Sequence, residues 1–217
     1  MLVLLGKELK LALSPLTKWF LCFALVTLIP RYPILTGAVL VCVGILYSFQ
    51  SFRESGDILY SLLLPLRRRD VVAGKFALCV LVEWIAFACM AGLAALRMTV
   101  LHTLPVYESN VMMAANLWFL ALTLLIFMAF NFVFVGGFFR SGGHVGRPFL
   151  RFLPLALILV LAGETLYRIP ALSLLNRVSG RGLWVQAALL GGAFAAYFGL
   201  TLLALRQSQA RFEEYEV

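Results

Sequence analysis

Charged residues are scarce in this chain. Only 13% of its 217 residues are Asp, Glu, Lys or Arg, 63% are hydrophobic, and the mean hydropathy is +0.98. A soluble domain is about a quarter charged and about half apolar. The composition therefore excludes an ordinary soluble domain and indicates an integral membrane protein.

Cysteine is also rare. The four cysteines, Cys22, Cys42, Cys79 and Cys89, all lie in apolar segments and show no CxxC spacing. Cysteines in such segments behave as small apolar residues. A disulfide or a metal site is therefore not expected.

The motifs of common hydrolases are missing. The "AGKF" stretch at 73–76 has a lysine but lacks the glycine spacing and the hydroxyl of a phosphate loop. No GxSxG or HExxH motif occurs, and the glycines of "RSGGHVGR" at 140–147 are explained by a turn. His102 and His144 fall on opposite sides of the membrane in the topology given below. We therefore expect no catalytic or metal-binding residue and no enzyme activity in this chain.

Long apolar stretches take up most of the sequence. Stretches of about 20 apolar residues between charged segments are typical of transmembrane helices. We predict an all-α polytopic membrane protein, a single domain of residues 1–217 with six transmembrane helices at 16–29, 34–49, 76–97, 111–139, 152–167 and 183–205.

Lys and Arg are distributed unevenly between the two sides of this topology. With both termini inside, the cytoplasmic segments hold 13 basic residues and the outer segments hold 5. The positive-inside rule then places both termini in the cytoplasm. The same rule accounts for the net charge of +8, so no nucleic-acid partner is needed to explain it.

Two cytoplasmic segments have an amphipathic pattern. Residues 1–14 place leucines on one helical face and lysines on another, which predicts a helix lying in the membrane interface. Within a cytoplasmic region at 50–75, residues 57–64 form a second short amphipathic helix, which Ser55 or Asp57 caps and Pro65 ends. This second helix is either a partner-binding element or a plain interfacial connector.

Polar side chains inside predicted spans each need a reason, because burying them in lipid is costly. Glu83 either pairs with a cationic group of another helix or lines a path. Asn116, Thr123 and Asn131 fall within one arc of the fourth span, which suits helix-to-helix hydrogen bonds or a water-facing stripe. Glu164 is expected to pair with Arg168 one turn later.

The sixth span carries two rows of small residues. Such spacing lets helix backbones approach closely, so this helix is expected to pack inside the bundle or at a dimer seam. The rows consist of Ala188, Gly192 and Ala196, and of Gly191, Ala195 and Gly199.

The segment "SLLLPLRRRDVVAGK" at 61–75 resembles a pattern, "SLPxxRxxIVxxK", found before the third span in permeases of type-2 ABC exporters, with two extra leucines here. The layout is similar to that of the small six-span permeases, including those of bacterial peptide exporters such as the phenol-soluble-modulin exporter. The resemblance covers the whole chain in layout and about twenty residues in motif.

This resemblance implies an exporter permease in a bacterial cell membrane. A separate cytoplasmic ATPase would bind ATP and Mg, so no cofactor is expected in this chain, and a second permease chain, identical or homologous, would complete the transporter. The apolar, aromatic-rich bundle suits an amphipathic or hydrophobic cargo such as a peptide. A secondary transporter or a stand-alone membrane enzyme remains an alternative. The ATPase would grip a coupling helix with Ser55, Asp57, Ile58, Leu59, Tyr60, Leu62, Leu63, Pro65, Arg67, Arg68 and Arg69.

Overall fold

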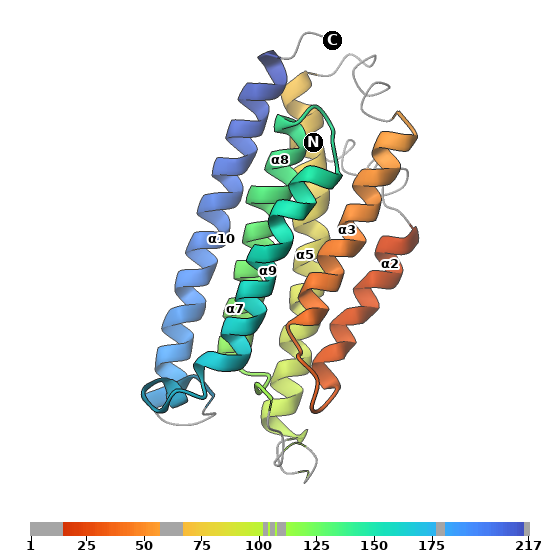
Figure 1. Ribbon diagram of the computed structural model, residues 1–217. Coiled ribbons are helices and arrows are strands. Elements are labelled where there is room, and N and C mark those ends of the chain that lie inside the picture. The colour runs from red at the N-terminus through yellow and green to blue at the C-terminus, as the bar shows by residue number, and fades with distance from the viewer. Residues whose placement is uncertain are drawn as a thin grey trace.

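A computed structural model describes residues 15–56, 67–101, 104, 107, 112–176 and 181–214, and these residues form helices with no strand among them. The all-α prediction is confirmed. Figure 1 shows the long helices side by side in an elongated bundle. The elements are α2 (Pro15–Leu21), η2 (Cys22–Leu28), α3 (Thr36–Glu54), α5 (Arg68–Thr99), α7 (Leu117–Ala129), η4 (Phe130–Val135), α8 (Gly136–Arg140), α9 (Gly146–Leu166), η5 (Pro170–Asn176) and α10 (Arg181–Glu214).

Five of the described helices are long and apolar enough to cross a membrane. They are α3, α5, α9, α10 and the continuous helix Leu117–Arg140, which joins α7, η4 and α8. The remaining apolar helix, Pro15–Leu28, is shorter. Because its second half is a 3₁₀ helix, which rises more per residue than an α-helix, it reaches roughly 25 Å against a hydrocarbon core of about 30 Å. A sixth span therefore stays a prediction.

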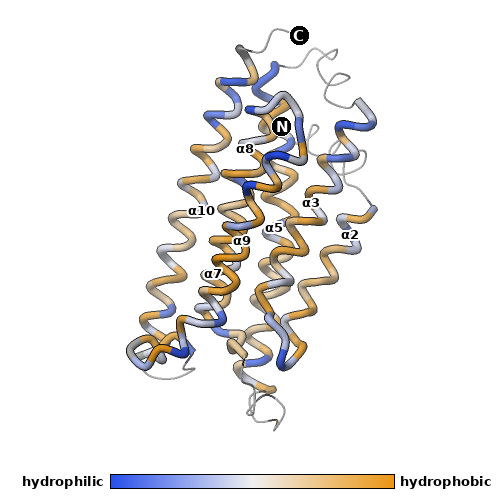
Figure 2. Tube along the Cα trace, viewed as in Figure 1, coloured by the Kyte–Doolittle hydropathy of each residue, from blue (hydrophilic) through white to orange (hydrophobic). Residues whose placement is uncertain are grey.

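Polar residues gather at the two ends of the bundle. Figure 2 shows an apolar middle and hydrophilic segments at both ends, most of all at the upper end. The end of α3, the start of α5, the turn between α8 and α9 and the end of α10 all lie at that upper end (Figure 1). These described parts of the segments that the sequence assigns to the cytoplasm thus lie at one end of the bundle.

The helix Leu117–Arg140 forms the centre of the bundle. Its apolar window is 78% buried, against 17% for α9 and 22% for α10. The outer faces of α9 and α10 instead expose large apolar side chains, among them Leu150, Ile158 and Trp184. Apolar surfaces of this extent are unstable in water, so the perimeter is suited to lipid.

The first two helices are in close contact through small residues of α3. A Cβ added at Gly44 would lie 2.4 Å from Phe20 Cβ, and one at Gly37 would lie 2.7 Å from the carbonyl oxygen of Phe23. The Thr17 hydroxyl, on α2, donates to the Gly44 carbonyl at 2.6 Å. These glycines, which the sequence pattern did not single out, let the backbones meet.

Replacing Gly44 by valine should therefore destabilise the protein. The added side chain overlaps Phe20, and overpacking of this kind costs about 1–3 kcal/mol. Gly92 is the matched control, because it lies on a long helix with no atom within 4 Å of its added Cβ. Thermal unfolding of the purified chain in detergent should show a clear drop for Gly44→Val and little change for Gly92→Val. Equal drops would contradict the close approach.

The turn between α8 and α9 depends on two glycines. Gly142 and Gly143 have φ values of 66° and 84°, a region that side chains other than glycine rarely adopt. The Gly143 amide donates to the Phe138 carbonyl at 3.0 Å, which closes the end of α8. Two of the three glycines of "RSGGHVGR", Gly142 and Gly143, are thus required by the turn.

Candidate functional site

Four polar side chains meet inside the bundle, and we call them the Glu83 cluster: Glu83 of α5, Asn131 of η4, and Tyr197 and Thr201 of α10. Tyr197 Oη donates to Glu83 Oε2 at 2.7 Å, and Asn131 Nδ2 donates to the same oxygen at 2.8 Å. Asn131 Nδ2 also donates to Thr201 Oγ1 at 3.4 Å. The cluster therefore joins three helical segments that are far apart in the sequence.

The cluster is almost completely buried. Glu83, Asn131 and Tyr197 are at most 1% exposed, and Thr201 is 8% exposed. The two donors to Glu83 are neutral groups, so the contacts seen here are not the pairing with a cation that was one reading of the sequence. A buried acid within a membrane span is a functional-site candidate, because such a group is costly to keep there.

Glu83 lies midway along its helix. The sequence pattern placed it about two turns into a span that begins at residue 76. The structure starts α5 at Arg68, which puts Glu83 roughly 22 Å from the start of the helix and at a similar distance from its end. The helix thus begins about two turns before the predicted start of the span, and the depth of Glu83 in the membrane stays a prediction.

The backbone is irregular at this site. Phe130–Val135 forms a π-helical segment, in which the Gly136 amide donates to the carbonyl of Asn131, five residues earlier. Short π segments interrupt otherwise regular helices and occur frequently at functional sites. Asn131 is thus part of the irregular segment and also supplies a donor to Glu83.

Aromatic rings surround the contact between α5 and α10. The Trp84 ring stacks at 5.8 Å on both Phe194 and Phe198, and it meets Phe87 edge-on at 5.6 Å. Trp84 also lies 6.0 Å from the Tyr197 ring, edge to face. These rings join the two helices beside Glu83 and add apolar cover to the cluster.

The other polar residues predicted on the fourth span do not join the cluster. Asn116 caps α7 by accepting from the Phe119 amide at 3.1 Å, and its Nδ2 donates to the Leu175 carbonyl at 2.9 Å. The Thr123 hydroxyl donates to the Phe119 carbonyl, one turn earlier, at 3.0 Å. Of the three residues on the predicted arc, only Asn131 contacts Glu83.

Glu164 interacts electrostatically with Arg168, as expected, and also accepts a hydrogen bond from a backbone amide. Its Oε2 accepts from the backbone amide of Met113 at 3.2 Å, which ties the segment before α7 to the end of α9. The Arg168 guanidinium lies 6.0 Å from the centre of the Tyr167 ring. These contacts support the structural role that the sequence predicted for Glu164.

A buried arginine, Arg97, contacts the end of η2. In the sequence it served only as one of the basic residues counted to assign the topology. Arg97 Nη1 donates to the Thr27 carbonyl at 2.7 Å, and Tyr107 Oη donates to the Leu28 carbonyl at 2.8 Å. The last carbonyls of a helix lack partners within it, so these two side chains satisfy them. The sequence pattern around a basic residue at the end of a span does not show which carbonyl groups it will contact.

The predicted coupling helix lies outside the described residues, as do Asp57, Ile58, Leu59, Tyr60, Leu62, Leu63 and Pro65. Its borders are described: Ser55 ends α3, and Arg67, Arg68 and Arg69 begin α5. Gln209 of α10 donates to the Arg69 carbonyl at 3.1 Å.

The start of α5 is held firmly by its neighbours. The Lys75 ammonium is fully buried and lies 3.6 Å from the centre of the Phe52 ring, at the end of α3. Arg140 of α8 donates to Gln207 of α10, close to the contact at Arg69. The helix that follows the predicted coupling segment is thus tied to both α3 and α10.

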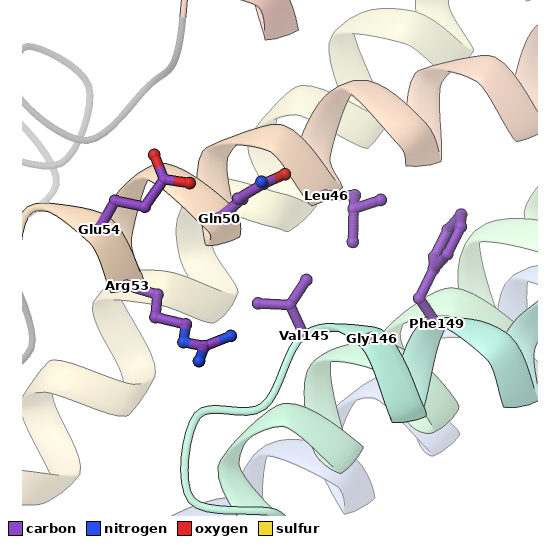
Figure 3. Close-up of a pocket in the computed structure, with 7 residues that line it drawn as sticks. All are labelled: Leu46, Gln50, Arg53, Glu54, Val145, Gly146 and Phe149. Carbon is purple, nitrogen blue, oxygen red and sulfur yellow. The ribbon is translucent and has the colours of Figure 1, made fainter.

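A cleft of about 500 Å³ opens at the same end of the bundle. Figure 3 shows Leu46, Gln50, Arg53 and Glu54 of α3 on one side and Val145, Gly146 and Phe149 on the other. Leu46 and Phe149 give the cleft an apolar part, and Arg53 and Glu54 give it a charged part. Its charged part directly precedes the predicted coupling segment.

The small residues of α10 face away from the bundle. Ala196 is half-buried and the others are exposed, and Gly191, Gly192 and Gly199 have no atom within 4 Å of an added Cβ. The buried face of α10 instead carries Gln186, Ala193, Tyr197, Thr201, Ala204 and Ser208. Of the two expectations for these rows, packing within this chain does not occur, and a seam with another chain stays a prediction.

A comparison with protein families shows which family the chain matches. The model described as "ABC-2 family transporter protein" matches residues 3–198, which is most of the chain. No curated protein and no solved structure matches this sequence.

Proposed function

Because the chain belongs to the ABC-2 transporter family, we propose that it is the permease subunit of an ABC exporter that a separate ATPase drives. The family match carries this proposal, and the five apolar helices support it. The sequence has no phosphate loop, which agrees with ATP and Mg being bound by the partner. The chain itself would then perform no catalysis.

The coupling helix at 57–64 would receive the motion of the ATPase. Its apolar face would lie in a groove of that partner, as amphipathic helices commonly do. The segment leads directly into α5, whose first turns contact α3 through Lys75 and α10 through Arg69. A push on the segment would therefore move α5 together with its neighbours, which is the kind of rigid-body motion that alternating access requires.

A second permease chain would pack against α10. Its outward face carries small residues at helical spacing, and in lipid such a face permits close backbone contact. We propose this face as the seam between two permease chains, identical or homologous. Crosslinking of cysteines introduced at Ala188 and Ala195 tests it, and a failure to crosslink at either position would exclude the seam.

The end of the bundle with the basic connections would face the cytoplasm of a bacterial cell. The excess of Lys and Arg in those connections supports this orientation. In intact cells, a cysteine at Ser55 or Ser141 should react only with permeant reagents, and one at Ser109 should react with impermeant ones. Labelling of position 55 from outside would reverse the topology.

The cargo is proposed to be amphipathic or hydrophobic, such as a membrane-active peptide. Trp84 of α5 and Phe194 and Phe198 of α10 form an aromatic surface across the two helices, and Phe198 is 48% exposed at the perimeter. A cargo that enters from the lipid would meet this surface. Cells that lack the chain and its ATPase should become sensitive to such peptides or retain them.

A secondary transporter is the second candidate, and the Glu83 cluster favours it specifically. Secondary transporters bind ions near the membrane midplane at interrupted helices. Here a buried acid, Glu83, lies midway along α5 and contacts Asn131 of the π segment in the central helix. The family match outweighs this observation, because it covers most of the chain.

The experiment that separates the two candidates is purification of the tagged full chain from native membranes. We expect an ABC ATPase to co-purify, and ATP hydrolysis to follow the fractions that contain both proteins. Recovery of the intact chain with no ATPase, in a detergent that preserves other membrane complexes, would contradict the proposal.

A further inference from the structure

The Glu83 cluster contains two acceptor atoms without a visible donor. Glu83 Oε1 and Asn131 Oδ1 are both buried, and neither has a hydrogen-bond partner in the described part of the chain. Glu83 Oε2, by contrast, accepts two hydrogen bonds. Unpaired buried acceptors cost free energy, so a donor that the heavy-atom positions do not show would stabilise the cluster.

The burial of the cluster restricts what that donor can be. All four side chains are at most 8% exposed, so a ligand of atomic size would have to displace packed groups. A proton on Glu83 needs no such space. It turns Oε1 from an acceptor into a donor, and it removes a negative charge that no cation hydrogen-bonded to Glu83 balances among the described residues.

We propose that Glu83 is a proton-binding site, in which the proton is carried by Oε1 and donated to the amide oxygen of Asn131. The proton comes from water, and its uptake converts the Glu83 carboxylate into a carboxylic acid. In this form Glu83 donates one hydrogen bond and accepts two, and Asn131 uses both ends of its amide. The site is independent of cargo and of any partner, since it lies within one chain.

Other titratable groups lie near Glu83. They are Cys42 of α3, Cys79 one turn earlier on α5, and Tyr197 of α10. The α7 and η4 segments contain no titratable residue, and Cys22 of η2 is exposed at the perimeter. All of these groups are neutral in their protonated forms, so none provides a positive charge that would hold Glu83 as a carboxylate.

Protonation also decides whether the three segments stay together. The neutral acid suits the packed arrangement of α5, η4 and α10. A carboxylate at the same place would be a buried charge with neutral donors only, which favours parting of the helices and entry of water. Loss of the proton to water would therefore accompany opening of the α5–α10 contact.

Infrared spectroscopy of the purified full chain in lipid nanodiscs tests this site. At neutral pH the wild type should show the C=O stretching band of a protonated carboxylic acid. Glu83→Gln should lose that band, and Glu164→Gln, which alters a half-buried acid near the end of α9, should keep it. The absence of the band in the wild type, or its full persistence in Glu83→Gln, would overturn the proposal.

A second measurement uses the pH dependence of stability. As the pH is raised from mildly acidic to neutral, the wild type should lose thermal stability, because Glu83 ionises in the unfolded chain over this range while the folded protein keeps its proton. Glu83→Gln should retain its melting temperature over the same range, because the amide NH₂ of glutamine can donate to Asn131 as the acid does. The titratable groups near Glu83 are the same in both proteins, so an identical decline in the two would also overturn the proposal.

Discussion

Replacing Leu59 or Leu62 by aspartate is expected to release most of the partner ATPase. If 57–64 is a coupling helix, these two leucines lie on the face that enters the partner's groove. An aspartate there would lose its hydration without gaining a partner, at a cost of several kcal/mol. Because binding energy is concentrated in a few central residues, one such change should suffice.

The measurement is a pull-down of the ATPase at matched membrane levels of each variant. Ser61→Asp is the matched control, since Ser61 lies on the opposite face of the predicted helix. The substitution adds the same charge as the two leucine variants. A plain interfacial connector makes a different prediction: weaker membrane seating with full ATPase binding. Full retention of the ATPase by both leucine variants would reject the coupling helix.

Replacing Asn131 by leucine should destabilise the bundle. The change removes the hydrogen bonds from Asn131 Nδ2 to Glu83 and to Thr201, and it leaves Glu83 with Tyr197 as its remaining donor. Leaving a buried polar group without its partner costs about 1–3 kcal/mol. Export should fall as well, because the hydrogen bonds through which Asn131 links α5 to α10 would be lost.

Thr123→Val is the matched control for this change. Thr123 is fully buried on the same helix, but its hydroxyl donates to a carbonyl of its own helix. Thermal unfolding in detergent should show a lower melting temperature for Asn131→Leu than for Thr123→Val. If the two variants unfold at the same temperature, the contacts of the Glu83 cluster do not stabilise the protein.

The helices could be predicted from the sequence because apolar stretches show directly where lipid is the solvent. Their ends could not. The third predicted span begins at residue 76, but α5 begins at Arg68, and the last predicted span ends at residue 205, but α10 continues to Glu214. Backbone hydrogen bonding does not stop where the side chains become polar, so a hydropathy pattern shortens helices that extend beyond the membrane.

The partners of the polar residues were only partly predictable. Glu83 was identified from the sequence because an acid within a membrane span is energetically costly. Asn131 was identified because it lies on the polar arc of the fourth span. Nothing in the pattern joined these two residues to Tyr197, because such contacts depend on how helices rotate when they pack. The π segment, which shifts the register at Asn131, is equally invisible in the sequence.

Small residues show the same limit. The rows on α10 had the spacing of a packed interface, but the tight contact within the chain is made by Gly37 and Gly44 of α3. The spacing of small residues shows that another helix can approach closely, but it does not show which helix does so. The exposed rows therefore direct attention to a second chain.

The contacts provide a mechanical route from the predicted coupling segment to the Glu83 cluster. The segment leads into Arg67 and Arg68, and α5 then runs without interruption to Glu83. There Tyr197 and Asn131 link α5 to α10 and to the central helix. A displacement at the start of α5 would thus be carried to the middle of the bundle by one helix.

Transport by purified components in lipid vesicles tests the central claim most directly. Inside-out vesicles would contain this chain alone, with its ATPase, or with an ATPase variant that cannot hydrolyse ATP, and the uptake of a labelled amphipathic peptide would be measured. The account predicts uptake only when the chain, the active ATPase and ATP are all present. Uptake by the chain alone under an ion gradient, or ATP hydrolysis by the chain alone, would contradict it.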